Sequence, residues 1–223
     1  MALSGPHSRL GLAAAVVVAV AVAVWGWSAG SGLDPTNPQV TLATVEATVA
    51  QKYPLPELTD AQLAGRFSGS AGQGSTGEGS PSEAPIGHGT SDLLFDVREP
   101  DEFAQSHLPG ARRIDPEMTV DDFQAAYGPE LKGRTVVFYC AVGVRSAQML
   151  TRLKPVLKSN GAAAAYNLRG GIFRWHASGR TLVADNTASG ARLVHPYNAA
   201  WGQLLDRTIK SGAAPQSKAP RAE

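Results

Sequence analysis

The sequence contains a single cysteine, Cys140, in surroundings that suggest chemistry. Cys140 directly follows the apolar run Thr135 to Tyr139 and opens the segment CAVGVRS, which leads into a helical pattern. In parallel α/β sheets, ligand sites lie where a loop joins the carboxyl end of a strand to the N-terminus of a helix. Loop N–H groups and the positive end of the helix dipole would bind an anion there and stabilise a thiolate. Cys140 is therefore a candidate nucleophile.

Two further residues of this loop fit that role, but a plainer interpretation stays open. Gly143 lets the backbone curl closely around an anion, because it has no side chain in the way. Arg145 carries a permanent charge that could form two parallel hydrogen bonds to an oxyanion. However, a cysteine after an apolar strand is often a small buried hydrophobic residue, and Arg145 could pair with a carboxylate at the surface. The spacing alone does not separate a reactive thiol from a structural one.

The elements that would position the loop follow an alternating pattern. From Asp92 onward, short apolar runs alternate with helical patterns, which predicts βαβ units and a parallel sheet. Strands are expected at Leu93 to Val97, Thr135 to Tyr139 and Ala162 to Leu168. Helices are expected in EPDEFAQSH, from Arg145 until Pro155 kinks or ends the helix, over Gly171 to Ser178, and in WGQLLDRTIK. The second of these strands is the most continuously apolar and should be central, covered on both faces.

Four short motifs in this part of the chain resemble those of the single-domain rhodaneses. They are LLFDVREPDEF, SHLPGA, VVFYCAVGVRS and NLRGGIFRW, and together they extend from about Asp92 to Val183. The earlier segment PELTDAQLAGRF also resembles the opening of that domain, which makes the Gly/Ser/Pro-rich linker between them an insertion within the domain. The resemblance implies an α/β fold, rhodanese-like, with a mostly parallel five-stranded sheet flanked by helices.

The same resemblance implies a sulfurtransferase. Cys140 would take sulfane sulfur from a donor such as thiosulfate, hold it as a persulfide and pass it to cyanide or a thiol acceptor. The cradle around the sulfur would consist of Ala141, Val142, Gly143, Val144 and Arg145. Asp96 and Arg98 match the DVR element of the family and would support the loop and pair locally, for example with Glu102, rather than touch the substrate. His107 would be a hydrogen-bonded turn residue, and Trp175 would pack beside the pocket. No metal and no organic cofactor are implied.

The loop departs from the usual family pattern, and two rival functions stay open. Ala141 and Val142 are apolar where the family often has polar or basic residues, which would weaken thiosulfate recognition or favour a less charged donor. Rhodanese-fold phosphatases and arsenate reductases use the same loop, but they have one residue more between Cys and Arg, and usually His where Tyr139 stands. The other rival is a non-catalytic module that senses sulfur species or binds a protein. The joint presence of Cys, Gly and Arg argues against this second rival.

Composition limits the remaining possibilities. With 223 residues, of which 43% are hydrophobic, the chain can form one well-packed domain with appendages. A net charge of +1 from 20 basic and 19 acidic residues, without a block of like charge, gives no reason to expect nucleic-acid binding. The lone cysteine forms no internal disulfide, and no close pair of Cys or His residues has zinc-ligand spacing.

The N-terminal part of the chain is different in kind. Residues 10–27 carry no charge and are close to the lower length limit for a transmembrane helix. Basic groups before this stretch and Asp34 after it would place the N-terminus in the cytoplasm and the domain on the outer, periplasmic side of a single-pass membrane protein. Small residues at 28–30 also allow a cleaved signal peptide, which would export the domain as well.

The expected organisation follows from these segments. Residues 1–9 would be a short cytoplasmic N-terminus, 10–27 a transmembrane helix or signal peptide, 28–52 a spacer, 53–185 the rhodanese-like domain with a disordered insertion at 68–90, and 186–223 a C-terminal extension. The expected partners are a small sulfur donor, a thiol or cyanide acceptor, and the membrane. His195, within the extension, is expected to be an ordinary turn residue.

Overall fold

The apolar runs of the sequence form one parallel sheet. The computed structural model describes residues 33–69, 92–184 and 194–212, and within them the sheet has five strands in the order β1-β5-β4-β2-β3. The strands are β1 (Glu57–Leu58), β2 (Leu93–Asp96), β3 (Arg112–Arg113), β4 (Thr135–Tyr139) and β5 (Ala164–Leu168). All neighbouring strands run parallel. The predicted α/β class with a parallel five-stranded sheet is therefore confirmed.

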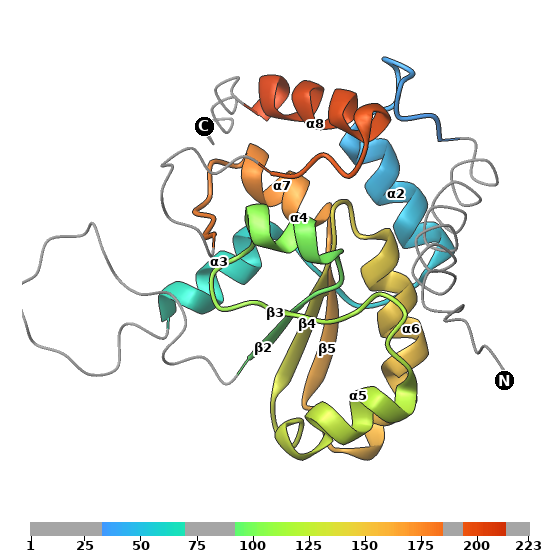
Figure 1. Cartoon of the computed structure of the whole chain (residues 1–223), viewed down its shortest axis with the longest axis vertical. Helices are drawn as coiled ribbons and strands as arrows, with labels where there is room; N and C mark the ends of the chain where they lie inside the picture. Colours follow the sequence, from blue (N-terminus) through green and yellow to red (C-terminus); the bar gives the residue numbers. More distant parts are fainter. Residues whose placement is uncertain (1–32, 70–91, 185–193, 213–223) are drawn as a thin grey trace, which may run out of the picture. The chain divides into compact units, whose positions relative to one another are not determined.

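Helices flank this sheet (Figure 1). They are α2 (Leu42–Lys52), α3 (Asp60–Gly69), α4 (Pro100–Gln105), α5 (Val120–Tyr127), α6 (Val144–Ser159), α7 (Gly171–Ala177) and α8 (Ala199–Gly212), with a 3-10 turn, η2 (Gly128–Glu130), after α5. On the face covered by α5 and α6, the rings of Phe95 and Phe138 contact that of Phe123. Leu153 of α6 belongs to the same core. Figure 1 shows α3 on the opposite side of the strands from α6.

The strand that leads into Cys140 is central and fully buried. All residues of β4 are buried, because the strand lies between β5 and β2 in the sheet. Its bounds, Thr135–Tyr139, are those predicted from the sequence. Loops at the carboxyl ends of parallel strands gather at one edge of the sheet, so Cys140 comes at the middle of that edge.

Helix α6 does not end at Pro155. It runs from Val144 to Ser159 with Pro155 inside it. A proline within a helix removes one backbone hydrogen bond and costs about 3 kcal/mol. Leu153 and Leu157, on either side of it, are buried in the core, and burial of such a side chain contributes about 1.5–3 kcal/mol. Packing on the sheet therefore outweighs the local preference of proline.

The folded unit begins before residue 53. Part of the predicted spacer, residues 42–52, forms helix α2, and three apolar residues on it are buried: Leu42, Val45 and Val49. Glu46 of α2 forms an ion pair with Arg174 of α7, with 2.8 Å between Oε1 and Nε. The spacer assignment is therefore corrected for these residues, because their apolar positions have helical spacing and pack on the domain.

The described part of the C-terminal extension also packs on the domain. Helix α8 lies beside α7 (Figure 1), and its Trp201, Leu204 and Leu205 are buried. Nη2 of Arg207 donates to the carbonyl oxygen of Pro35 at 2.7 Å and to that of Val40 at 3.2 Å. Residues 199–212 are therefore an integral part of the folded unit.

The predicted single-pass membrane protein is contradicted. In the ranges that the structure covers, no helix is long and apolar enough to cross a membrane. A crossing needs about 20 apolar residues, whereas α6, the longest described helix, has 16 residues and carries several charges. The stretch 10–27, with the transmembrane or signal-peptide assignment, lies outside the described residues, as does the insertion 68–90 apart from residues 68 and 69 of α3. The membrane partner and the periplasmic location rested on that stretch and have no support.

Candidate functional site

Cys140 begins a loop that closes back on its own sulfur. The backbone N–H of Gly143 donates to Sγ of Cys140 at 3.2 Å. Gly143 has a φ of 99°, a left-handed conformation that glycine adopts at little cost. Helix α6 starts at the next residue, Val144. The sulfur is thus bound at a helix N-terminus, where the helix dipole favours negative charge.

Asn167 of β5 holds the loop from the side. Its Nδ2 donates to the carbonyl oxygen of Gly143 at 3.2 Å, and its Oδ1 accepts from the hydroxyl of Ser146 at 2.7 Å. Both Asn167 and Ser146 are buried. One side chain on the neighbouring strand therefore fixes the turn of the loop and the first turn of α6 together.

The first turn of α7 holds the same loop by its carbonyl groups. The N–H of Ile172 donates to the carbonyl oxygen of Cys140 at 2.9 Å, and that of Phe173 to the carbonyl oxygen of Ala141 at 3.1 Å. In a trans peptide the N–H lies opposite the carbonyl of the preceding residue, so the N–H groups of Ala141 and Val142 face away from α7. The first N–H groups of α6 have no partner within the helix. These backbone donors are the groups that the loop can offer to an anion.

Replacing Gly171 by Ala is expected to lower the free energy of unfolding by about 2–4 kcal/mol, through overpacking and a strained backbone. Gly171 has a φ of 53°, and a Cβ there would overlap the carbonyl oxygen of Cys140 and lie 2.7 Å from that of Ala141. Urea denaturation measures the change.

Gly179→Ala is the matched control for this substitution. Gly179 has a φ of 70°, but a Cβ on it would have nothing within 4 Å, so only the backbone strain of about 1–2 kcal/mol applies. Equal losses in the two variants would contradict the close approach of α7 to the loop.

Arg145 is paired inside the domain. Its Nη1 and Nη2 donate to Oε2 and Oε1 of Glu102 at 2.7 and 2.8 Å, and only 7% of its side chain is exposed. Burial disfavours the charge of Arg145, but the carboxylate of Glu102 outweighs burial and raises the pKa of Arg145 above its ordinary value. Oε2 of Glu102 also accepts from the N–H of Glu99 at 3.1 Å, which caps α4. The pair therefore connects the loop to α4.

Asp96 and Arg98 form a second, fully buried pair. Nη2 and Nε of Arg98 donate to Oδ2 and Oδ1 of Asp96 at 2.6 and 2.9 Å, and Nη2 donates also to the carbonyl oxygen of Ser106 at 2.7 Å. The ring of Tyr139 lies 5.8 Å from the Arg98 guanidinium carbon, and its hydroxyl accepts from the N–H of Leu108 at 3.0 Å. Burial, and then the charge of Asp96, raise the pKa of Tyr139. This cluster fixes the end of β4.

His107 and Trp175 make contacts outside the loop. Nδ1 of His107 lies 3.0 Å from the carbonyl oxygen of Phe103, and the two rings stack with centroids 3.8 Å apart. Nε1 of Trp175 donates to the carbonyl oxygen of Thr181 at 2.8 Å, and its ring meets that of Phe67 edge-on at 6.0 Å. These contacts tie α4 to the segment directly after it, and α7 to α3 and to the segment that follows α7.

Three residues that were not predicted as site residues also contact the loop: Glu102, Asn167 and Tyr197. In the sequence, Glu102 stands three residues after Glu99, a spacing typical of a helix start. This spacing does not indicate that Glu102 pairs with Arg145. Asn167 is the polar residue of a predicted strand, and a buried amide of that kind needs hydrogen-bond partners. The ring of Tyr197 lies 4.9 Å from the Arg145 guanidinium carbon, and nothing in the extension signals this contact.

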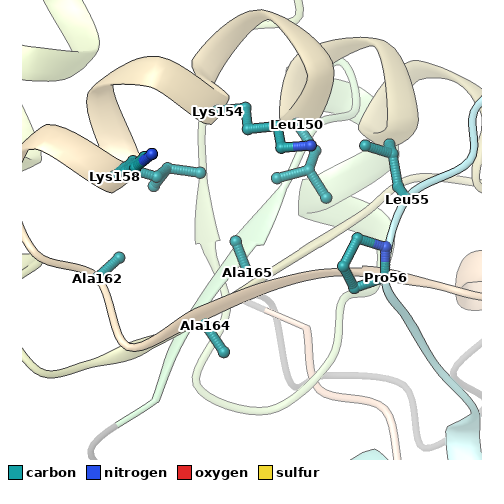
Figure 2. Close-up of a pocket in the computed structure, with 9 residues that line it drawn as sticks. Leu55, Pro56, Leu150, Lys154, Lys158, Ala162, Ala164 and Ala165 are labelled. Atoms are coloured by element: carbon teal, nitrogen blue, oxygen red, sulfur yellow. The ribbon is translucent and has the colours of Figure 1, made fainter.

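An apolar pocket lies elsewhere on the molecule (Figure 2). It encloses about 230 Å³, and its lining includes Leu55, Pro56, Leu150, Leu157, Ala162 and Ala165. Lys154 and Lys158 of α6 also line it. The pocket contains neither Cys140 nor any other residue of its loop. Among the described residues, no group of three or more His, Cys, Asp or Glu side chains could hold a metal ion.

Comparisons with known proteins identify relatives of this chain. The rhodanese-like domain family matches residues 83–178. A protein named Sulfurtransferase from Allochromatium vinosum is 37% identical over 92 residues, which cover 41% of this chain and 78% of that protein. The uncharacterized protein YqhL of Bacillus subtilis is 35% identical over 82 residues, and the match spans 37% of this chain and 59% of the length of YqhL. A solved rhodanese-like domain protein from Staphylococcus aureus shares 22% identity over 59% of this chain and 100% of that chain, with a TM-score of 0.38.

Proposed function

The chain belongs to the rhodanese-like domain family, and from this premise we propose that it is a sulfurtransferase in which Cys140 carries the transferred sulfur. A relative that is named Sulfurtransferase supports this class of reaction. The donor and the acceptor are proposed from the chemistry of the site.

One observation carries the proposal, the binding of Sγ of Cys140 by the Gly143 N–H at the start of α6. Backbone dipoles in such a loop stabilise an anionic sulfur, whether a thiolate or the outer sulfur of a persulfide. A cysteine that only filled space would require neither the left-handed Gly143 nor the buried Asn167 that fixes it. Only four residues lie between Cys140 and Arg145. A loop this short suits one sulfur atom better than a phosphoryl group.

The proposed reaction has two halves. The thiolate of Cys140 attacks the outer sulfur of a sulfane donor. With thiosulfate, the S–S bond breaks, sulfite leaves with the bonding electron pair, and Cys140 becomes a persulfide. Cyanide or a thiol then attacks the outer sulfur, and Cys140 leaves as a thiolate. Neither half needs an oxidant or a reductant. Because the chain contains no other cysteine, an acceptor thiol comes from another molecule.

The other residues of the site are proposed to position the sulfur. Ala141, Val142, Gly143 and Val144 would supply backbone groups to the cradle. We propose that Arg145 anchors the first turn of α6 to Glu102, because Nη1 and Nη2 of Arg145 donate to the two carboxylate oxygens of Glu102. Asp96 and Arg98 would fix the end of β4, and His107 and Trp175 would pack around the loop.

Sulfur loading of the full chain tests the proposal. Reduced protein, incubated anaerobically with thiosulfate or an alkyl persulfide, should gain the mass of one sulfur atom, and cyanide should remove that sulfur as thiocyanate. Intact mass spectrometry measures both steps. If the chain gains sulfur from no donor but hydrolyses a phosphate ester, the proposal is wrong and the protein is a phosphatase. If it does neither, the protein is a non-catalytic module.

A further inference from the structure

The guanidinium of Arg145 is paired along one edge, packed against an aromatic ring, and only 7% exposed. Along the edge, Nη1 and Nη2 both donate to Glu102 at 2.7 and 2.8 Å. The guanidinium carbon also lies over the ring of Tyr197, 4.9 Å from the ring centroid. Ala141 and Val142, which precede Arg145 in the loop, are apolar and buried. An anionic donor that reached the loop would therefore find Arg145 buried and already paired.

The ring of Tyr197 is held in this place against a backbone cost. Among the described residues, Tyr197 is the non-glycine position with a positive φ, 67°, which costs such a residue about 1–2 kcal/mol. Its N–H donates to Nδ1 of His195 at 3.1 Å. The next residue, Asn198, caps α8 by accepting the N–H of Trp201 on its Oδ1 at 3.1 Å. Strain of this kind persists where the placement of the side chain matters.

Several carboxylates lie near Tyr197. Glu99, Asp101 and Glu102 stand at the start of α4, and Glu102 and Glu99 act electrostatically on Tyr197 together with Arg145. Asp101 lies 4.0 Å from Nε2 of His195. A dianion that approaches this edge of the sheet would meet these carboxylates, whereas Arg145 is already neutralised by one of them.

We propose that Tyr197 is a specificity-determining residue, whose ring keeps anionic donors off Arg145 and leaves the site selective for an organic persulfide with an uncharged carbon body over thiosulfate. This inference rests on the proposed function. The thiolate of Cys140 attacks the outer sulfur of R–S–SH, the S–S bond breaks, and R–S⁻ leaves with the bonding electron pair. The outer sulfur and its proton stay on Cys140 as S–SH, so atoms and electrons balance.

The test compares two donors on the full chain. The rates at which Cys140 gains sulfur from thiosulfate and from 2-hydroxyethyl persulfide are measured by mass spectrometry, and their ratio is compared with that of the unaltered chain. Tyr197→Gly removes the ring and also the backbone strain, because glycine tolerates this φ. Tyr197→Phe is the matched control, since it keeps the ring over Arg145.

Tyr197→Gly should raise the thiosulfate-to-persulfide rate ratio about tenfold, because the three guanidinium N–H groups that Glu102 does not use become accessible to the donor and one of them can form a charge-assisted hydrogen bond. Added salt should reduce this rise. Tyr197→Phe should keep the original ratio. An unchanged ratio in Tyr197→Gly, with both donors still loading, would overturn the role of Tyr197 and leave the sulfurtransferase intact. Loading from neither donor in the unaltered chain would overturn the proposed function itself.

A second variant keeps the test decisive if the first disturbs the fold. Tyr197→Asn also lacks the ring, and asparagine tolerates the left-handed conformation. Thermal unfolding of each variant shows whether α8 stays packed. If every folded variant without the ring speeds both donors equally, the ring is a general barrier to access and the selectivity proposed here is wrong.

Discussion

Cys140→Ser is expected to reduce sulfur loading from every donor to below about 0.1% of the original rate, because a serine hydroxyl at neutral pH does not replace a thiolate nucleophile. The substitution suits the site, since a serine oxygen can still accept the Gly143 N–H that now binds Sγ at 3.2 Å. The chain contains no other cysteine, so no second thiol can take up the sulfur. Intact mass after incubation with thiosulfate or an alkyl persulfide measures the loss.

The thermal midpoint of Cys140→Ser separates lost chemistry from lost folding. Cys140 is 1% exposed, and a hydroxyl that keeps a hydrogen bond in this place should cost no more than about 1–2 kcal/mol. Cys140→Ala, which has neither thiol nor hydroxyl, should lose loading to the same extent. Sulfur that still adds to either variant would be bound elsewhere, and the role assigned to Cys140 would fall.

Asp96→Asn is expected to lower the free energy of unfolding by about 3–5 kcal/mol, because it leaves the charge of Arg98 buried without its counter-charge. Both side chains of this pair are 0% exposed. Within the part of the chain that the structure describes, Nη1 of Arg98 already has no hydrogen-bond partner, so the buried guanidinium has few other contacts that offset the loss of the Asp96 charge. In a domain of this size the thermal midpoint should fall by about 10 °C. Urea unfolding and calorimetry measure the two quantities.

Arg112→Gln is the exposed counterpart of this experiment. Arg112 pairs with Glu130 at 2.9 Å, but their side chains are 47% and 37% exposed, and exposed pairs contribute about 0–1 kcal/mol. Adding Arg98→Met to Asp96→Asn should recover part of the lost stability, since the unpaired buried charge is then gone. If Asp96→Asn unfolded at the same urea concentration as Arg112→Gln, the buried pair would have no special weight in this fold.

The sheet and the loop could be predicted from the sequence because their signals are local. A continuous apolar run defines β4 from Thr135 to Tyr139, and the helical pattern that follows defines the start of α6. The position of Cys140 between them depends only on these neighbours. A strand that is buried on both faces needs apolar residues at successive positions, so the sequence pattern by itself predicts such a strand.

The partners of the loop could not be predicted, because they come from distant segments. Arg145 pairs with Glu102 across 43 positions, and the sequence offers many other carboxylates. Tyr197 reaches Arg145 only because α8 packs beside α7, which no local pattern specifies. Helix α2 was missed as part of the domain for the same reason, since its apolar face shows a helix but not the surface on which it packs.

The hydrogen bonds between Arg207 and the segment before α2 have a consequence for the time at which the site forms. Arg207 and Pro35 are 172 positions apart, and Glu57 of β1 pairs with Arg169 across 112 positions. Contacts of such separation pay the entropy of loop closure before they contribute stability, which slows folding. Helix α2 is the first described helix to be synthesised, and its ion pair with Arg174 of α7 can form only after α7 has left the ribosome. Tyr197 is made just before α8, so its contact with Arg145 is expected to be among the last of the site to form, after the cysteine loop itself has left the ribosome.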